Sequence, residues 1–549
     1  MSHSQAAPDA GSEPSSEPGS GLSSEPGSGL SSEPSSEPGS EATSLPAEES
    51  LGDRVRSAAK WSMINTLLIR IGTFATGVIL ARGALTPRDW GLYAVGGVAQ
   101  AVLLSFNELG VSLAVVRWDR DPRSFAPTVV TLATASSTVL YVGLWFLAHD
   151  IAVMLGSPDA TGVLRILCFA VVVDGVACVP NAVLMREFRQ RARLTIDLLT
   201  FAVSSGLTLL LAFRGWGASS FAWGGVAGVM VALIGCGIAA PGYLRPGWDR
   251  TVARELVRYG APLAGASLFV LATMNTDSAV VGATLGPVAL GLYRVAFTMS
   301  SWPVRAISET ARRVSFAGFS RAAVSEQTLT DGFTGGLSPL LIASVPACAL
   351  LAALPGPIIR SVYGDQWTGA AGALRYLAIL GLLRIIFELC YDFMVAAGRS
   401  RALLTVQALW LAALIPALYI GAHRNGISGV GAGHIVVAAG LIAPAYLLTL
   451  RAVGIHPLRI AAVTWRPILG GAAVVAVAIA VNHVAGDSDA GLAGASLVAM
   501  VAYVPIAVPA SVMRQVWAVA QSRIGRRRRP IPSPIIVDER LASGESASA

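Results

Sequence analysis

Charged residues are scarce in this chain of 549 residues. Asp, Glu, Lys and Arg together make up 13% of it, about half their share of an ordinary soluble domain. Hydrophobic residues make up 54%, and the mean hydropathy is +0.61, so a conventional soluble protein is excluded. The net charge of +7 does not predict a nucleic-acid partner, because the arginines gather between apolar segments, as in membrane topology.

Cysteine is also rare, and the motifs of enzymes are missing. The five cysteines lie inside apolar runs without metal-ligand spacing, so we interpret them as small packing residues. The sequence has no Walker loop, no Gly-x-Ser-x-Gly motif and no histidine set spaced for a metal. We therefore expect no cofactor, no metal site and no enzymatic activity.

Both ends of the chain differ in composition from the rest. Residues 1–52 are rich in Ser, Glu, Pro and Gly and repeat one eight-residue unit at Ser15–Leu22 and Ser23–Leu30. Such a segment cannot bury enough apolar surface to fold, so it is predicted to be a disordered cytoplasmic tail. It lacks the basic and apolar regions of a secretory signal. Residues 515–549, with a basic run at Arg526–Arg529, are predicted to be a second disordered cytoplasmic tail.

Between these tails, apolar runs long enough to cross a bilayer recur along the chain. They predict an all-α polytopic membrane protein with about fourteen transmembrane helices. The expected helices lie near residues 60–82, 90–116, 126–148, 161–185, 195–213, 217–240, 259–285, 288–311, 333–354, 371–397, 403–421, 427–450, 462–483 and 490–513.

Arginines are concentrated in every second connection between these helices. The arginine-rich connections include Arg186–Arg193, Arg399–Arg401 and Arg526–Arg529, whereas the opposite set carries isolated residues such as Arg88 and Arg360. Because cytoplasmic loops carry the excess of positive charge, the arginine-rich set and both termini are predicted to be cytoplasmic.

One motif occurs twice. Leu85–Val95 and Leu285–Val295 both read Leu-x-Pro-x-x-x-Gly-Leu-Tyr-x-Val, 200 residues apart. Six predicted helices separate the copies, so both copies have the same orientation in the membrane. We therefore predict two parallel-repeat lobes of six helices, at residues 53–255 and 256–452, followed by two further helices at 453–514.

Charged residues inside the predicted helices are the candidate functional residues. A charge at the middle of a membrane helix costs roughly 2.5–3.5 kcal/mol on the insertion scale, so such residues should face protein or water. They predict a hydrophilic cavity between the lobes, in which arginines hold an anionic headgroup and carboxylates balance charge or couple to ions. The candidate substrate-binding residues are Arg70, Glu108, Asp277, Arg294, Arg305, Glu309, Arg384, Glu388 and Asp392.

Spacing along the helices leaves a second interpretation open for some of these residues. Arg294 and Arg305 are eleven residues apart, close to three helical turns, and are predicted to share a face. Arg384 and Glu388, and likewise Arg305 and Glu309, are four residues apart. These two pairs could instead be internal ion pairs that fix helix packing.

Several short motifs, in this order, resemble a known family. They are Trp61-Ser62, Leu80-Ala81-Arg82, the first repeat copy, Glu108-Leu109-Gly110, Asp277 with the second repeat copy, Tyr363-Gly364-Asp365-Gln366-Trp367, Leu374-Arg375 and Gly398-Arg399. Together they resemble bacterial polysaccharide flippases of the multidrug/oligosaccharidyl-lipid/polysaccharide (MOP) exporter superfamily, over roughly residues 55–450. Ser278 departs from the pattern, because a basic residue is expected after the aspartate, which places a charge pair there in doubt.

The resemblance implies a flippase that moves an undecaprenyl-diphosphate-linked oligosaccharide from the inner to the outer leaflet by alternating access. It implies the bacterial inner membrane as location, membrane lipid as surroundings, and polysaccharide polymerase and chain-length proteins as partners. On this view Arg70, Arg294 and Arg305 contact the headgroup, with Glu108 and Asp277 as counter-charges or coupling groups.

Three alternatives remain from the sequence. A cation-coupled multidrug antiporter of the same superfamily predicts a cavity richer in carboxylates than in arginines. A polytopic polysaccharide polymerase, an enzyme, needs a large outward loop with catalytic arginines, and the predicted outward loops are short. A membrane scaffold without transport activity is the third.

Overall fold

A computed structural model describes residues 51–107, 115, 118, 120–322, 326–486 and 488–508. It describes the side chains of these residues except 51–60, 105–107, 259, 261–270, 272–273, 306–322, 326–331 and 400. Glu108, the side chain of Glu309, and nearly all of both predicted tails therefore lie outside the described residues.

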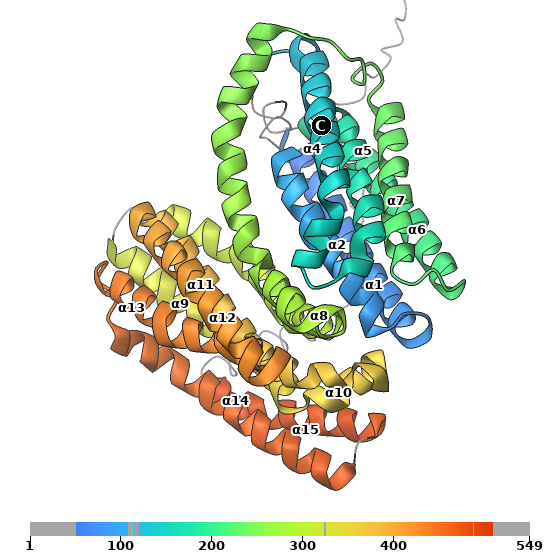
Figure 1. Cartoon of the computed structure of the whole chain (residues 1–549). Helices are drawn as coiled ribbons and strands as arrows, with labels where there is room; N and C mark the ends of the chain where they lie inside the picture. The colour runs from blue at the N-terminus through green and yellow to red at the C-terminus, as the bar shows by residue number, and fades with distance from the viewer. Residues whose placement is uncertain are drawn as a thin grey trace, which may run out of the picture. The chain divides into compact units, whose positions relative to one another are not determined.

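The described part of the chain is helical and contains no β-strand (Figure 1). The first helices are α1 (Leu51–Gly83), α2 (Pro87–Asn107), α4 (Pro122–Met154), α5 (Thr161–Arg186), α6 (Gln190–Phe213) and α7 (Ser219–Ala239). They are followed by α8 (Arg250–Ala322), α9 (Glu326–Ala353), α10 (Pro355–Tyr363), α11 (Ala371–Ala396), α12 (Ser400–Val437), α13 (Ala443–Arg451), α14 (Pro457–Ala485) and α15 (Asp489–Ala507).

Two of these elements are interrupted, and each interruption separates two of the predicted helices. In α8 the backbone leaves helical geometry at Gly286, whose φ is 80°, a value that glycine adopts without a steric penalty. In α12 it does so at Asn425 and Gly426. Ten helices in the described part are long and apolar enough to cross a membrane. The predicted fold class, a polytopic all-α membrane protein of about fourteen helices, is confirmed.

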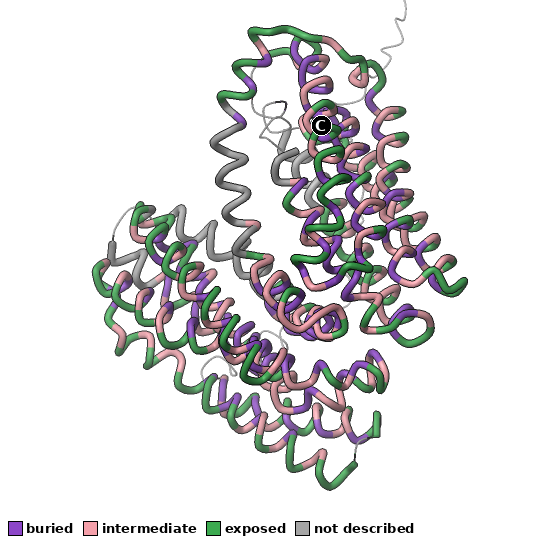
Figure 2. The backbone as a smooth tube through the Cα atoms, in the orientation of Figure 1, coloured by how far each residue is buried: buried purple, intermediate pink, exposed green. Residues whose placement is uncertain are grey.

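Large apolar side chains on the helix surfaces fit a lipid environment. Along α15 the buried positions recur every fourth residue and are mostly small, whereas Leu497 and Val501 are 67% and 66% exposed. Ile238 on α7 is 77% exposed. Figure 2 shows buried and exposed positions alternating along α14 and α15 in this way. In water such a surface would be a liability, so these faces are the ones that contact lipid.

Small residues let α6 and α7 approach closely. A Cβ atom at Gly224 of α7 would overlap the Thr208 hydroxyl of α6 and lie 2.8 Å from the Ser204 carbonyl oxygen. A Cβ at Gly228, one turn on, would lie 2.9 Å from the Ser204 Cβ. This is the small-xxx-small arrangement by which membrane helices pack when no hydrophobic effect drives them together.

Gly228→Leu is expected to lower the thermal stability of the purified protein. The added side chain must displace α6, and overpacking of this kind costs about 1–3 kcal/mol. Thermal denaturation in detergent, followed by size-exclusion chromatography, measures the change. Gly206→Leu on α6 is the matched control, because nothing lies within 4 Å of a Cβ at Gly206. Equal melting temperatures for both variants would contradict this account of the α6–α7 contact.

The first repeat copy begins α2 with a reciprocal cap. The Thr86 backbone N–H donates to the Asp89 carboxylate at 3.0 Å, and the Thr86 hydroxyl donates to the same oxygen at 2.7 Å. The other carboxylate oxygen of Asp89 accepts from the Ala218 backbone N–H at 3.2 Å. Asp89 thus both stabilises the start of α2 and ties it to the start of α7.

The two repeat copies pack against each other, and their shared Gly and Pro positions make the contact. A Cβ at Gly91 of α2 would overlap the Pro287 carbonyl oxygen and lie 2.5 Å from its carbon. A Cβ at Gly291 of α8 would likewise overlap the Pro87 carbonyl oxygen and lie 2.8 Å from its carbon. The contact is reciprocal, as expected for a duplicated unit with a pseudo-twofold axis.

A second set of contacts lies beside the repeat and links α1 to the segment after α9. The guanidinium group of Arg82 donates to the backbone carbonyls of Ser361 and Val362, the second at 2.9 Å from Nε. Gln366 and Trp367 donate through their side chains to the Ala81 carbonyl, at 2.6 and 3.0 Å. The accepting carbonyls of Ser361 and Val362 belong to the short helix α10, and Gln366 and Trp367 belong to the 3₁₀ turn Asp365–Ala370. The sequence did not predict either segment as helical.

Candidate functional site

A cavity of about 610 Å³ is lined by residues of α8, α11, α12 and α13. Its volume lies within the range of ordinary ligand-binding sites. All of its lining residues lie between Met274 and Tyr446, within the predicted second lobe at residues 256–452. The cavity therefore lies within the second half of the chain, whereas the sequence led us to expect lining residues from both halves.

Five of the nine candidate residues come together in this cavity. Three of them are arginines and two are carboxylates, so the charged lining carries one net positive charge. They are Asp277, Arg294, Arg305, Arg384 and Glu388. Arg294 and Arg305 both line the cavity, which agrees with their predicted shared face.

The remaining four candidates lie elsewhere or are not described. Arg70 is exposed on α1 and is not among the lining residues. Asp392 is buried on α11, with 7% of its surface exposed, and is not a lining residue either. Glu108 and the side chain of Glu309 lie outside the described residues, so the predicted pair of Glu309 with Arg305 stays a prediction.

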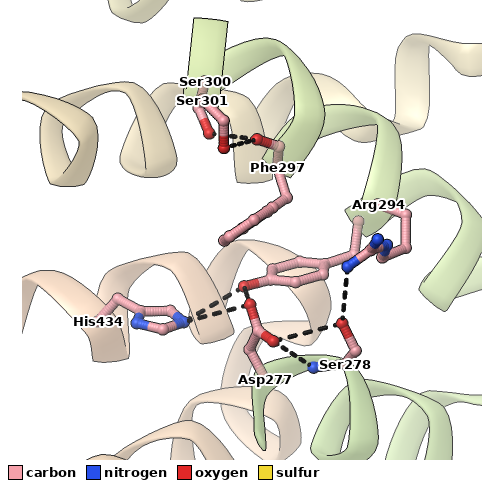
Figure 3. A network of polar contacts seen from close by, with 8 residues as sticks. Asp277, Ser278, Arg294, Phe297, Ser300, Ser301 and His434 are labelled. Atoms are coloured by element: carbon pink, nitrogen blue, oxygen red, sulfur yellow. Dashed lines mark hydrogen bonds and ion pairs between the residues drawn. The ribbon is translucent and has the colours of Figure 1, made fainter. Parts of the chain in front are cut away.

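The break in α8 separates the residues of a buried polar network at the cavity wall (Figure 3). Asp277 lies before the break, and Tyr293 and Arg294 lie after it. The Tyr293 hydroxyl donates to the Asp277 carboxylate at 2.9 Å and lies 3.2 Å from Nε2 of His434. His434 Nε2 is 4.0 Å from the same carboxylate oxygen. Because Asp277, Tyr293 and His434 are each less than 10% exposed, these hydrogen bonds satisfy polar groups that are largely removed from solvent.

Ser278 links this network to a cavity arginine. Its backbone N–H donates to the other carboxylate oxygen of Asp277 at 2.6 Å, and its hydroxyl lies 3.3 Å from that oxygen. Nη1 of Arg294 donates to the same hydroxyl at 3.4 Å. The sequence placed the charge pair at this point in doubt because Ser278 is not basic. The structure shows instead that the Ser278 hydroxyl joins Asp277 to Arg294, seventeen residues after Asp277.

Two cavity arginines approach the ring of Phe297. The guanidinium carbon of Arg294 lies 6.0 Å from the ring centroid, and that of Arg384 lies 5.7 Å from it, at the outer limit of cation–π distances. Among the described side chains Arg384 and Glu388 form no ion pair, although both line the cavity.

Sequence reasoning missed His434 and the aromatic part of the lining. His434 stands alone in its own stretch of sequence, and its partner Asp277 is 157 residues away, so no local pattern indicated the pairing. The aromatic residues Phe387, Trp410 and Tyr446 also line the cavity, but in an apolar helix an aromatic residue gives no signal of its own. In the described part of the chain no group of three or more His, Cys, Asp or Glu residues could hold a metal ion.

Comparison with known proteins gives the family. The model of a family described as polysaccharide biosynthesis protein matches residues 79–372, more than half of the chain. The chain belongs to the polysaccharide biosynthesis protein family. The family match includes the repeat contact and the cavity residues Asp277, Arg294 and Arg305.

Individual proteins with a similar sequence or structure agree with this family assignment. Over 392 residues this chain is 24% identical to the lipopolysaccharide biosynthesis protein WzxC of Escherichia coli (strain K12). The match covers 71% of this chain and 79% of WzxC. The lipid II flippase MurJ in an inward closed conformation has a similar structure, with a TM-score of 0.67 and 14% identity over 84% of this chain and 100% of MurJ.

A multidrug resistance MATE family transporter of the MOP superfamily, in an inward-facing conformation, has a TM-score of 0.55. It is 16% identical to this chain, and the match covers 72% of this chain and 99% of the transporter. At these identities the structural matches establish the fold alone. The resemblance to proteins of polysaccharide biosynthesis, predicted from short motifs, is confirmed by the family match and by WzxC.

Proposed function

We propose that this protein carries a polyprenyl-diphosphate-linked oligosaccharide from the inner to the outer leaflet of a bacterial plasma membrane. The diphosphate and sugars occupy the cavity, and the polyprenyl tail stays in the lipid. The product then becomes the substrate of polysaccharide polymerase and chain-length proteins at the outer face.

The observation that carries this proposal is the set of three arginines lining a cavity within apolar helices. Each such charge costs roughly 2.5–3.5 kcal/mol to place in a membrane segment. Contact with a ligand or with solvent in the cavity offsets this cost for the three arginines. Guanidinium groups bind phosphate oxygens in pairs through charge-assisted hydrogen bonds. Among the described lining residues only Asp277 and Glu388 balance them, and this excess of positive charge favours an anionic ligand such as a diphosphate.

The arginine-rich connections support an orientation for this transport. If they are cytoplasmic, both termini lie in the cytoplasm and the contact between Gly91 and Pro287 lies toward the outer face. The contacts of Arg82 with the segment after α9 lie at the same end. Transport by alternating access requires these contacts to close the outer side and then to separate.

Arg294→Gln and Arg384→Gln are each expected to reduce export of surface polysaccharide at least tenfold. Each substitution removes a charge-assisted hydrogen-bond donor, which contributes roughly 1.5–3 kcal/mol. Export is measured in cells that depend on this protein, and binding of undecaprenyl diphosphate is measured on the purified protein in lipid nanodiscs.

Arg375→Gln is the control for these variants. Arg375 lies on the same helix as Arg384, is exposed, and does not line the cavity. The proposal requires both export and diphosphate binding to survive this change. It would be wrong if the double variant Arg294→Gln/Arg384→Gln exported polysaccharide as well as the unmodified protein at equal membrane levels.

The structural similarity to a multidrug transporter keeps the cation-coupled antiporter as the second candidate. A cation-coupled multidrug antiporter predicts more carboxylates than arginines in the cavity, and the described lining has the opposite balance. Overexpression that raised drug resistance, with surface polysaccharide unchanged on deletion, would favour the antiporter.

A further inference from the structure

A single π-helical turn interrupts the cavity wall between α12 and α13. It spans Ala438–Ile442, and the Ala443 backbone N–H donates to the Ala438 carbonyl, five residues before it. Pro444 follows directly and has no N–H to donate to Gly440, while its ring would clash with that carbonyl in a continuous α-helix. The proline therefore explains why the helix widens here, and such turns are frequent at functional sites.

This turn changes which side chains share a face. His434 and Tyr446 are twelve residues apart, so on an ideal α-helix they would lie about 120° apart around the axis. A π turn takes up one extra residue, which reduces this angle to about 20°. Both residues line the cavity, roughly 17 Å apart along the helix axis at 1.5 Å per residue. The turn thus extends the cavity lining from His434 to Tyr446.

Tyr446 belongs to an aromatic wall at its own end of the cavity. Its ring stacks on Phe387 of α11, with centroids 5.4 Å apart and planes 26° apart. Phe387 meets Trp410 of α12 edge to face, with centroids 5.5 Å apart. Phe387 follows Arg384 by three residues, so this wall begins less than one helical turn from a cavity arginine.

The Tyr446 hydroxyl is a buried polar group with no hydrogen-bond partner within the described part of the chain. Tyr446 is 2% exposed, and leaving such a hydroxyl unpaired costs free energy that a phenylalanine at this position would avoid. Packing alone therefore does not account for a tyrosine here. A ligand that brings its own hydrogen-bonding group to this end of the cavity would account for the tyrosine.

We propose that Phe387, Trp410 and Tyr446 form a subsite for the sugar ring next to the diphosphate. A pyranose ring presents a C–H face that packs on aromatic rings and hydroxyls that hydrogen-bond to a tyrosine or to the nearby Gln407 side chain, which also lines the cavity. The wall lies beside Arg384, so the first sugar reaches it while the diphosphate stays at the arginines. This inference rests on the proposed function and adds the part of the substrate that the aromatic wall recognises.

The test compares two lipids that differ by one sugar. Binding of undecaprenyl diphosphate and of undecaprenyl-diphosphate glucose is measured on the full chain in nanodiscs. Tyr446→Phe removes one oxygen and is expected to weaken binding of the glucosylated lipid roughly three- to tenfold. Trp410→Ala is expected to weaken it roughly tenfold. Neither variant should change binding of undecaprenyl diphosphate by more than about twofold.

The controls are Trp465→Ala and Tyr419→Phe, since both residues are more than half exposed and neither lines the cavity. Equal affinity of Tyr446→Phe and of the unmodified protein for the glucosylated lipid would overturn the subsite. So would an equal loss for both lipids in Tyr446→Phe and Trp410→Ala. If the unmodified protein bound neither lipid, the proposed function itself would fail and the subsite with it, so the two failures are distinguishable.

Discussion

Gly91→Ala is expected to abolish export while the protein still folds and reaches the membrane. The added methyl group would overlap the Pro287 carbonyl, a backbone group that cannot rotate away. The contact between α2 and α8 can then form only if the helices move apart. Overpacking costs of about 1–3 kcal/mol correspond to a 5- to 150-fold shift away from the closed arrangement. Gly291→Ala should have the same effect because the contact is reciprocal.

Gly97→Ala, on the same helix as Gly91, is the matched control, since nothing lies within 4 Å of a Cβ there. Export is measured together with labelling of Ala81→Cys by a membrane-impermeant maleimide. Ala81 is fully buried beneath the contact with Trp367, so labelling should be low with Gly91 and high with Gly91→Ala. Normal export by both Gly91→Ala and Gly291→Ala would show that closure at this point is not needed for transport.

Asp277→Ala is expected to have the second largest effect, on both stability and transport. Its carboxylate accepts hydrogen bonds from the Tyr293 hydroxyl and from Ser278, and hydrogen bonds to charged groups contribute roughly 1.5–3 kcal/mol each. The truncation also leaves Tyr293 and His434 without their common partner. We expect a marked fall in melting temperature and loss of export.

Asp277→Asn separates the charge of this residue from its shape. The amide oxygen can still accept from Ser278, and the Tyr293 hydroxyl can turn to His434 Nε2, 3.2 Å away, so the fold should survive. The net charge of the cavity lining rises by one, which is expected to tighten binding of undecaprenyl diphosphate roughly tenfold and to slow its release. Asp150→Asn on the exposed face of α4 is the control. Unchanged or weaker diphosphate binding in Asp277→Asn would contradict this electrostatic role.

The fold was largely predictable because its determinants are local. Apolar runs of about twenty residues gave the helices, and Gly286 with Pro287 marked the point at which α8 breaks. The repeated Gly-Leu-Tyr motif indicated a duplicated unit. Its sequence did not show that Gly91 would pack on Pro287, since that contact joins segments 196 residues apart. The short helix α10 was missed because it lies between membrane segments, where hydropathy gives no signal.

The candidate site was predictable only where charge marked it. Arg294, Arg305 and Arg384 were found because an arginine in an apolar helix is costly. Arg70 carried the same signal but lies outside the described cavity, since cost alone does not tell which face of a helix a side chain occupies. Tyr446 could not be placed from helical spacing, because a count of 3.6 residues per turn fails across the π turn.

The contacts around Arg82 have a consequence for how such proteins diverge. The acceptors for Arg82, Gln366 and Trp367 are all backbone carbonyl oxygens, at Ser361, Val362, Ala81 and Leu85. Every residue type supplies the same carbonyl group. These hydrogen bonds therefore depend on side-chain identity only at the three donors, and a substitution at an accepting residue keeps its bond whenever the new side chain leaves the backbone in place.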